Sequence, residues 1–133
     1  MASQCAPSQT HCEFYLCLEK EMNCGYRGFP LRYGYRFCER FKTDPEISEN
    51  LSQWLKTTRF CLQDKIAKGE SYTCKNMNKK SVKDHMNCYL DTGYCDLNKK
   101  EKNFVKKKII AEFLSAPGYI TQNAIEFLKK GCR

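Results

Sequence analysis

Ten cysteines in a chain of 133 residues limit what this protein can fold into more than any other feature of its sequence. So many cysteines in so short a chain are typical of a domain held together by disulfides in an oxidising compartment. The number is even, which allows every cysteine to pair, but the count alone leaves roughly 900 connectivities open. We therefore predict one disulfide-rich domain of a secreted, extracellular protein.

The spacing of these cysteines argues against a zinc site. Structural zinc requires two matched pairs of closely spaced ligands, and the nearest cysteines here, Cys12 and Cys17, lack a matching second pair. The two histidines, His11 and His85, do not complete such a pattern. We expect no metal and no cofactor. No apolar run approaches the ~18 residues of a membrane span.

Apolar residues recur at helical spacing between Asp44 and Gly69, and this segment is the clearest predicted helix. Asp44 is a suitable N-cap, Pro45 fits the first helical position, and Gly69 ends the pattern. The stripe expected to face the core consists of Ile47, Leu51, Trp54, Leu55, Thr58, Cys61, Leu62 and Ile66. So regular a stripe indicates core packing and not a cofactor site.

Five other segments show helical patterns. They are residues 12–24, a stretch from about residue 32, residues 82–90 behind a Ser81 cap, residues 98–116 before Pro117-Gly118, and residues 122–130 behind a Thr121 cap. The alternation typical of strands is scarce. We predict an all-α fold, a single disulfide-rich domain of five or six helices over residues 12–133. Residues 1–11 are expected to form a mostly flexible lead-in.

A positive net charge of +8 favours anionic partners. Six lysines lie between Lys99 and Lys108, and the run Lys106, Lys107 and Lys108 is a candidate contact for an anionic glycan or a membrane surface. The alternative is a solvated basic surface with no partner. We expect no nucleic-acid partner.

A second candidate surface lies in residues 26–36, where tyrosines alternate with arginines. The candidate partner-binding residues are Tyr26, Arg27, Arg32, Tyr33, Tyr35 and Arg36. Tyr and Arg dominate the energetic hot spots of protein interfaces. The alternative is that the aromatic side chains fill the core while the arginines are only solvated.

The segment from Asp84 to Cys95 contains a possible active-site motif of an enzyme. His85 is followed three residues later by Cys88-Tyr89, which resembles the His-Asp-x-Cys-Tyr signature of secreted phospholipases A2. That catalysis needs an aspartate after the histidine to hold Ca²⁺. Here Met86 follows His85, and a thioether is a poor ligand for a hard cation. We therefore expect no enzymatic activity.

The cysteines and the short motifs around them follow a recognisable order. The order is Cys5; C-x4-C-L-E from Cys12 to Glu19; Cys24; Y-x-x-C-x-x-F from Tyr35 to Phe41; Cys61-Leu62; Cys74, Cys88-Tyr89 and Cys95 at steps of fourteen and seven residues; and Cys132. This order resembles the core of the stanniocalcins, a family of secreted, disulfide-rich glycoprotein hormones. The resemblance covers essentially the whole chain from Cys5.

The resemblance implies a set of disulfides. The implied pairs are Cys5–Cys17, Cys12–Cys38, Cys24–Cys74, Cys61–Cys88 and Cys95–Cys132. It also implies a non-enzymatic signalling or inhibitory ligand, tied to calcium and phosphate regulation or to inhibition of the pappalysin metalloproteinases. The expected partner is an extracellular receptor or proteinase. The alternative is a secreted cationic toxin or effector that acts on anionic membranes or glycans, with a phospholipase A2-like activity ranked third.

The chain departs from the family pattern in two informative ways. The cysteine that links the family's covalent dimer has no counterpart, so we expect no covalent dimer. The family's glycosylation sequon after C-L-E is absent, and Asn50-Leu51-Ser52 is the one sequon in the sequence. Asn50 is therefore the candidate glycosylation site.

Overall fold

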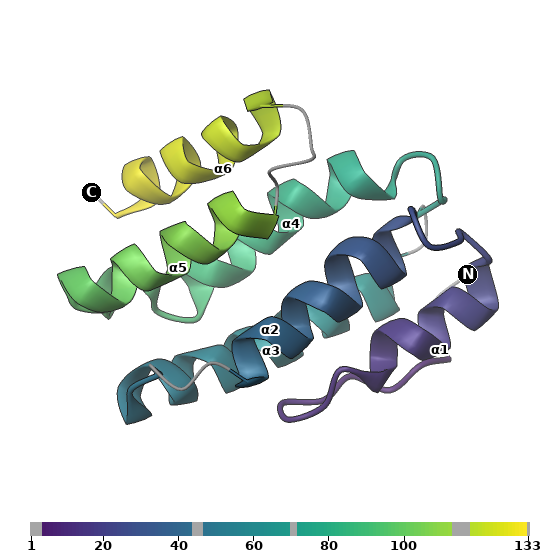
Figure 1. The fold of residues 1–133 in the computed structure, drawn as a ribbon, viewed down its shortest axis with the longest axis horizontal. Coiled ribbons are helices and arrows are strands. Elements are labelled where there is room, and N and C mark those ends of the chain that lie inside the picture. The colour runs from purple at the N-terminus through teal and green to yellow at the C-terminus, as the bar shows by residue number, and fades with distance from the viewer. Residues whose placement is uncertain (1–3, 44–46, 70–71, 113–117, 133) are drawn as a thin grey trace.

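A computed structural model describes residues 4–43, 47–69, 72–112 and 118–132 of the protein. In these segments the chain forms six α-helices and no strand (Figure 1), which confirms the predicted disulfide-rich all-α class. The helices are α1 (Glu13–Met22), α2 (Arg36–Thr43), α3 (Glu49–Lys68), α4 (Met77–Asp91), α5 (Lys99–Glu112) and α6 (Gly118–Gly131). Two short helical turns, Pro30–Tyr35 and Tyr94–Asp96, precede α2 and α5.

Helix α3 carries the predicted apolar stripe, and the stripe is buried. Leu51, Trp54 and Leu62 face the interior, and Ile47 and Cys61 are half-buried beside them. The helix nevertheless begins later than predicted. Ile47 and Ser48 are not helical, and the Ser48 hydroxyl caps α3 by accepting a hydrogen bond from the Leu51 amide at 3.1 Å.

The expected cap at Asp44 and first turn at Pro45 were wrong for this helix, because α3 starts at Glu49. Both residues lie outside the described part of the chain. Asp and Ser are about equally suited to the N-cap position, so residue preference alone does not favour Asp44 over Ser48. The choice of Ser48 depends on a contact with a distant helix, described below.

Helices α4 and α6 begin about one turn earlier than predicted. Helix α4 starts at Met77, because Thr73 and Asn76 exchange side-chain and backbone hydrogen bonds of 2.8 and 3.1 Å that form a turn ahead of it. Ser81 therefore lies inside the helix and is not its cap. Helix α6 starts at Gly118, which places Thr121 inside it, and it ends at Gly131.

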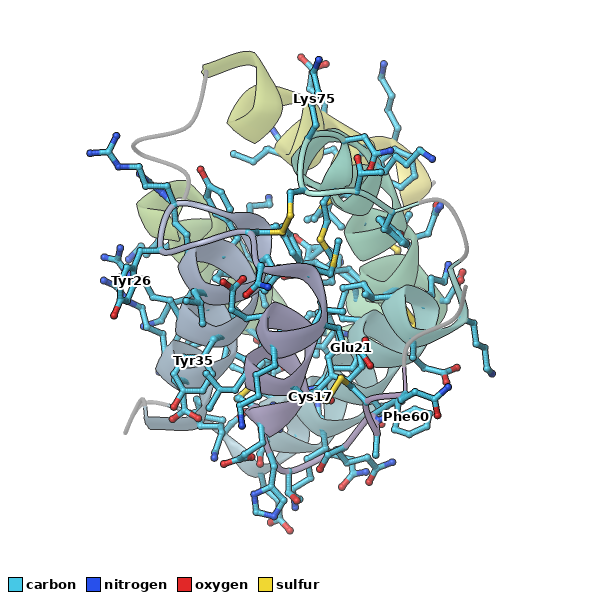
Figure 2. The ribbon with its side chains drawn as sticks, turned by 90° about the vertical axis from the view of Figure 1, so that its right-hand side faces the viewer. Cys17, Glu21, Tyr26, Tyr35, Phe60 and Lys75 are labelled. Atoms are coloured by element: carbon cyan, nitrogen blue, oxygen red, sulfur yellow. A yellow bond between two sulfur atoms is a disulfide. The ribbon has the colours of Figure 1, made fainter. Side chains whose placement is uncertain are left out.

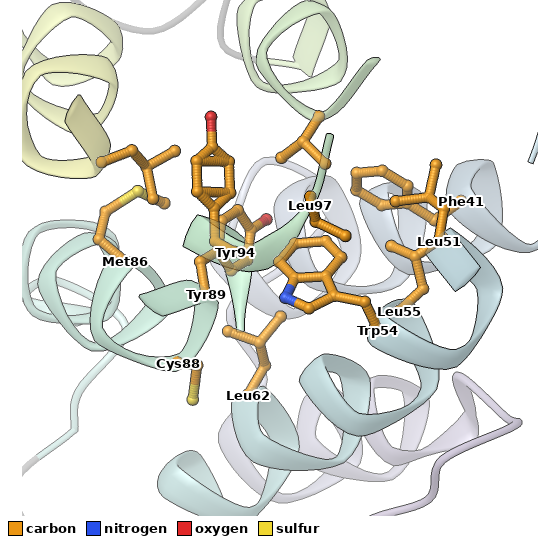
Figure 3. Close-up of a cluster of buried hydrophobic side chains, with 12 residues drawn as sticks. Phe41, Leu51, Trp54, Leu55, Leu62, Met86, Cys88, Tyr89, Tyr94 and Leu97 are labelled. Atoms are coloured by element: carbon orange, nitrogen blue, oxygen red, sulfur yellow. The ribbon is translucent and has the colours of Figure 1, made fainter. Parts of the chain in front are cut away.

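The described interior consists of two groups of buried side chains. The C-terminal cluster (Figure 3) is built around α3, α4 and α5 from Phe41, Leu51, Trp54, Leu55, Leu62, Met86, Cys88, Tyr89, Tyr94, Leu97, Val105 and Leu128. The N-terminal cluster consists of Cys5, Cys12, Phe14, Tyr15, Leu18, Phe29, Cys38, Ile66, Ala67 and Met77. In Figure 1, α2 and α3 lie between α1 on one side and α4, α5 and α6 on the other. Helix α3 contributes to both clusters and joins them.

Five disulfides cross-link the helices. They are Cys5–Cys17, Cys12–Cys38, Cys24–Cys74, Cys61–Cys88 and Cys95–Cys132, and they leave no free cysteine. These five pairs coincide with those implied by the resemblance to stanniocalcins. Five disulfides are typical of an extracellular or secreted protein. None of the described helices combines the length and the apolar character that crossing a bilayer requires.

The segment before α1 lies against α3. The fully buried Gln63 accepts a hydrogen bond from the Ser8 amide at 2.8 Å and donates one to the His11 carbonyl at 3.0 Å. The Arg59 guanidinium donates to the carbonyl of Gln9. Residues 1–11 were predicted to form a mostly flexible lead-in, but from Ser8 onward this stretch is held by the buried side chains of Gln63 and Arg59.

Candidate functional site

The Tyr/Arg segment, residues 26–36, runs from a tight turn into a wide helical turn and the start of α2. Its first residue, Tyr26, is 90% exposed, the largest exposed fraction among the exposed large hydrophobic side chains of the described chain. Figure 2 shows Tyr26 and Tyr35 on the same side of the molecule. The segment follows α1 directly, so its position depends on how the chain is fixed at residues 23–28.

The start of the segment is fixed by a carboxylate and a disulfide. Both oxygens of Glu19 accept backbone hydrogen bonds, from Cys24 at 3.1 Å and from Gly25 at 2.8 Å. Gly25 has a φ of 84°, which glycine adopts without strain, and its carbonyl accepts from the amide of Gly28. The Cys24–Cys74 bond ties this turn to the start of α4. The turn that presents Tyr26 is therefore held in one conformation.

The second half of the segment packs closely on α1. Phe29 is buried, and Gly34 lies so near the Tyr15 ring that an added Cβ atom would come within 2.3 Å of the ring carbon Cδ1. The turn over Pro30–Tyr35 is a π-helical one, wider than an α-helical turn, with the amide of Arg36 bonded to the Leu31 carbonyl. Such single π turns are frequent at functional sites.

The structure separates the six predicted binding residues into two groups. Tyr26, Arg27 and Arg36 are exposed. Tyr33 and Tyr35 are half-buried and pack against the N-terminal cluster. The half-buried Arg32 guanidinium lies over the Tyr33 ring, 5.6 Å from its centroid. Tyr33 and Tyr35 thus support the core, whereas Tyr26 faces solvent, and partner binding by this segment stays a prediction.

The lysines of α5 do not form one patch. Lys106, Lys107 and Lys108 follow one another, so successive side chains turn by about 100° around the helix. Lys108 lies 5.3 Å from the centroid of the Phe104 ring, whereas Lys107 is exposed and borders a groove next to α3. The predicted run therefore divides between different sides of the helix.

Asn50 lies in the first turn of α3 and is exposed. Its Nδ2 atom, which would carry a glycan, donates a hydrogen bond of 3.3 Å to Glu101. Glu101, which was not among the predicted site residues, is a buried carboxylate that joins the N-termini of α3 and α5. It accepts from Ser48, the cap of α3, at 2.8 Å and from the backbone of Asn98 at 3.0 Å, while Asn98 accepts from the Glu101 amide.

These contacts form a capping box at the start of α5, a pattern that Asn98-x-x-Glu101 signals in the sequence. The hydrogen bonds from Asn98 and Ser48 hold the pKa of Glu101 below its ordinary value of 4.5. The shared carboxylate also explains why Ser48 is the N-cap of α3, because the Ser48 hydroxyl donates to Glu101 while it caps its own helix.

The phospholipase motif lies on α4. Met86, at the position where such an enzyme carries its calcium ligand, is buried in the C-terminal cluster. Its thioether is therefore a core group and is turned away from the solvent that a catalytic calcium site would need. The side chain of His85 lies outside the described part of the structure.

One group of potential metal ligands comes together among the described residues: Cys5, Cys17 and Glu21, within 4.8 Å of one another. Figure 2 shows Cys17 and Glu21 side by side. The two sulfur atoms are bonded to each other at 2.03 Å, so neither is a thiolate. Glu21 accepts a hydrogen bond from the amide of Gln4. The group is a disulfide beside a carboxylate and not a metal centre.

A cavity of about 30 Å³ lies between the two clusters, bordered by Tyr15, Trp54, Arg59 and Tyr89 among others. That volume suits one or two waters and is far below the ~300 Å³ of a small-molecule pocket. Burial raises the pKa of both tyrosine hydroxyls above the ordinary value of 10, and the nearby Arg59 opposes this only partly for Tyr15. Both hydroxyls therefore remain protonated at neutral pH and are poor general bases.

Comparisons with protein-family models, with curated proteins and with solved structures found no match to this chain.

Proposed function

We propose that this protein is a secreted, non-enzymatic signalling or inhibitory ligand of the stanniocalcin type, which binds an extracellular protein through Tyr26 and Arg27. The observation that carries the proposal is the agreement between the five disulfides of the structure and the five pairs that the resemblance implies. One arrangement among roughly 900 is a specific agreement.

The Tyr/Arg segment supports the choice of binding surface. The Glu19 carboxylate and the Cys24–Cys74 disulfide hold the turn that presents Tyr26, and Gly34 seats the following turn against Tyr15. A rigid loop loses little conformational entropy on binding, and an exposed tyrosine can bury a large area against a partner. Because all ten cysteines are paired internally, we expect the partner to be held without a covalent bond.

The test is inhibition of a purified pappalysin metalloproteinase that cleaves a peptide substrate. The oxidised protein should inhibit in a dose-dependent manner, and the reduced and alkylated protein should not. Tyr26→Ala with Arg27→Ala should weaken inhibition on the order of tenfold, the usual effect of losing an interface hot spot. A matched control, Phe60→Ala with Lys75→Ala, removes an exposed aromatic and a cation elsewhere and should leave inhibition unchanged.

Two results would count against the proposal. Peptide mapping that finds a free thiol or a Cys88–Cys95 bond would remove the resemblance on which the proposal rests. Calcium-dependent release of fatty acid from phospholipid, lost in His85→Ala, would instead favour the phospholipase interpretation. Absence of inhibition together with a correct disulfide map would exclude the proteinase partner and leave calcium and phosphate regulation as the form of signalling to test.

A further inference from the structure

A groove of about 750 Å³ runs beside the first turns of α5 and α3. Three exposed lysines border it, Lys99, Lys100 and Lys107. The buried Leu51 and the half-buried Phe104 also line it. We call this feature the lysine groove. It combines a concave shape with a concentration of positive charge.

Helical periodicity explains why Lys100 and Lys107 border the same groove. Lys100, Asn103, Phe104 and Lys107 are spaced at i, i+3, i+4 and i+7, which places them on one face of α5. The two lysines of this face are about 10 Å apart along the helix axis. Lys102 lies instead near the Tyr94 ring, at 5.9 Å from its centroid.

The charge of the lysine groove is only partly balanced. Among the described residues that line it, Glu101 is the single carboxylate. Glu101 is 6% exposed, and its two oxygens accept hydrogen bonds from Ser48, Asn50 and Asn98. Three exposed ammonium groups therefore face solvent against one buried carboxylate. Such a concave, positively charged surface attracts anions.

We propose that the lysine groove binds a chain of sulfated glycosaminoglycan. The inference rests on the secreted location within the proposed function, because sulfated glycans are polyanions of the extracellular space. A membrane surface fits the structure less well. Amphipathic membrane binding needs apolar side chains next to the basic ones, and the exposed large hydrophobic side chains of the described chain, Leu16, Tyr26 and Phe60, lie on α1, the Tyr/Arg segment and α3.

The experiment measures the affinity of the oxidised protein for a heparin oligosaccharide by calorimetry. Lys99→Gln, Lys100→Gln and Lys107→Gln together should weaken binding on the order of tenfold. The matched control, Lys20→Gln, Lys68→Gln and Lys75→Gln, removes the same charge from α1, the end of α3 and the turn before α4. It should weaken binding less than about twofold. Arginine at the three groove positions should preserve binding, which separates loss of charge from loss of fold.

Affinity for the unmodified protein should also fall steeply between about 0.05 M and about 0.3 M salt, because the contacts are ionic. Equal losses in the groove variant and its control would show attraction by net charge alone and overturn the proposal. Failure to bind heparin at physiological salt would do the same. Tight binding to anionic lipid vesicles that depends on the groove lysines would assign the surface to membranes instead. All these results are independent of proteinase inhibition, so this inference and the proposed function can fail separately.

Discussion

The N-terminal and C-terminal clusters are held together in different ways. Three of the ten residues of the N-terminal cluster are disulfide cysteines, Cys5, Cys12 and Cys38. The C-terminal cluster contains only one, Cys88, among its twelve residues. Its interior is instead dominated by large aromatic and aliphatic side chains around Trp54. The difference is one of degree: two disulfides, Cys61–Cys88 and Cys95–Cys132, also lie at the C-terminal cluster, but cysteines form a larger share of the buried N-terminal residues. A smaller share of large apolar side chains makes covalent cross-links more important.

The ring of Trp54 contacts two other aromatic rings in the C-terminal cluster. Its ring meets Tyr89 edge-on at 5.4 Å and Tyr94 at 6.2 Å between centroids. In the N-terminal cluster, Phe14 and Tyr15 form an edge-on pair at 5.4 Å, and Phe29 and Tyr33 form a separate tilted pair at 6.2 Å. Such pairs stabilise beyond the area they bury, by about 1 kcal/mol each. The two clusters should therefore respond differently to loss of a ring and to loss of a disulfide.

The largest effect is expected from Trp54→Ala, which should lower the free energy of unfolding by about 3–5 kcal/mol. It leaves a cavity in the centre of the C-terminal cluster, between α3 and α4. Denaturant unfolding followed by far-ultraviolet circular dichroism measures the change. Phe60→Ala, an exposed ring on the same helix, is the control and should cost less than about 1 kcal/mol. Equal costs for the two rings would contradict the view that this region depends on packing.

Removing the Cys12–Cys38 bond by double substitution to alanine should cost roughly 3 kcal/mol, mainly by freeing the unfolded chain. The loss should be local as well, because this bond joins the residue before α1 directly to α2. Hydrogen exchange should become faster in α1 while α4 stays protected. The matched variant without Cys95–Cys132 should keep α1 protected. Uniform acceleration over both regions in the Cys12–Cys38 variant would show that the two clusters unfold as one unit.

Gly34→Ala tests the contact that seats the Tyr/Arg segment on α1. The new methyl group would overlap the buried Tyr15 ring, and overpacking of this kind costs about 1–3 kcal/mol. Thermal unfolding of the oxidised protein measures it. Tyr26→Ala, in the same segment but exposed, should leave stability within about 0.5 kcal/mol of the parent while it weakens partner binding. A stable Gly34→Ala variant would mean that Tyr15 can move aside.

The smallest effect is expected from Glu101→Gln, which should cost about 1 kcal/mol at neutral pH through loss of the shared cap. Folding lowers the pKa of this carboxyl, so its contribution is complete above the ordinary value of 4.5 and is lost as the pH falls below it. Unfolding free energies of the parent and the variant should therefore converge under acid conditions. A difference that stays constant down to low pH would show that the carboxylate charge does not stabilise the junction.

The helical class, the buried stripe of α3 and the disulfide scaffold could be predicted from the sequence. Helical periodicity and cysteine spacing are properties of residues close together in the chain, so both can be read from the sequence alone. The stripe through Leu51 and Trp54 is an example, because its 3.6-residue repeat indicates an α-helix with one buried face. The pairing of the cysteines came from the resemblance, since spacing alone left it open.

Only the tertiary structure determined which polar side chains are buried and which charged side chains lie close together. Gln63 and Arg59 are hydrophilic residues on the flank of the α3 stripe, and they are buried because the backbone of residues 8–11 satisfies their hydrogen bonds. Glu101 accepts a hydrogen bond from Ser48, more than fifty residues earlier in the chain, and so helps to fix the N-cap of α3. Burial of Val105 in the core fixes the rotation of α5 about its axis. That rotation determines which lysines border the groove and which lie on the flanks of the helix. Each of these outcomes depends on contacts between distant segments, which local sequence patterns do not record.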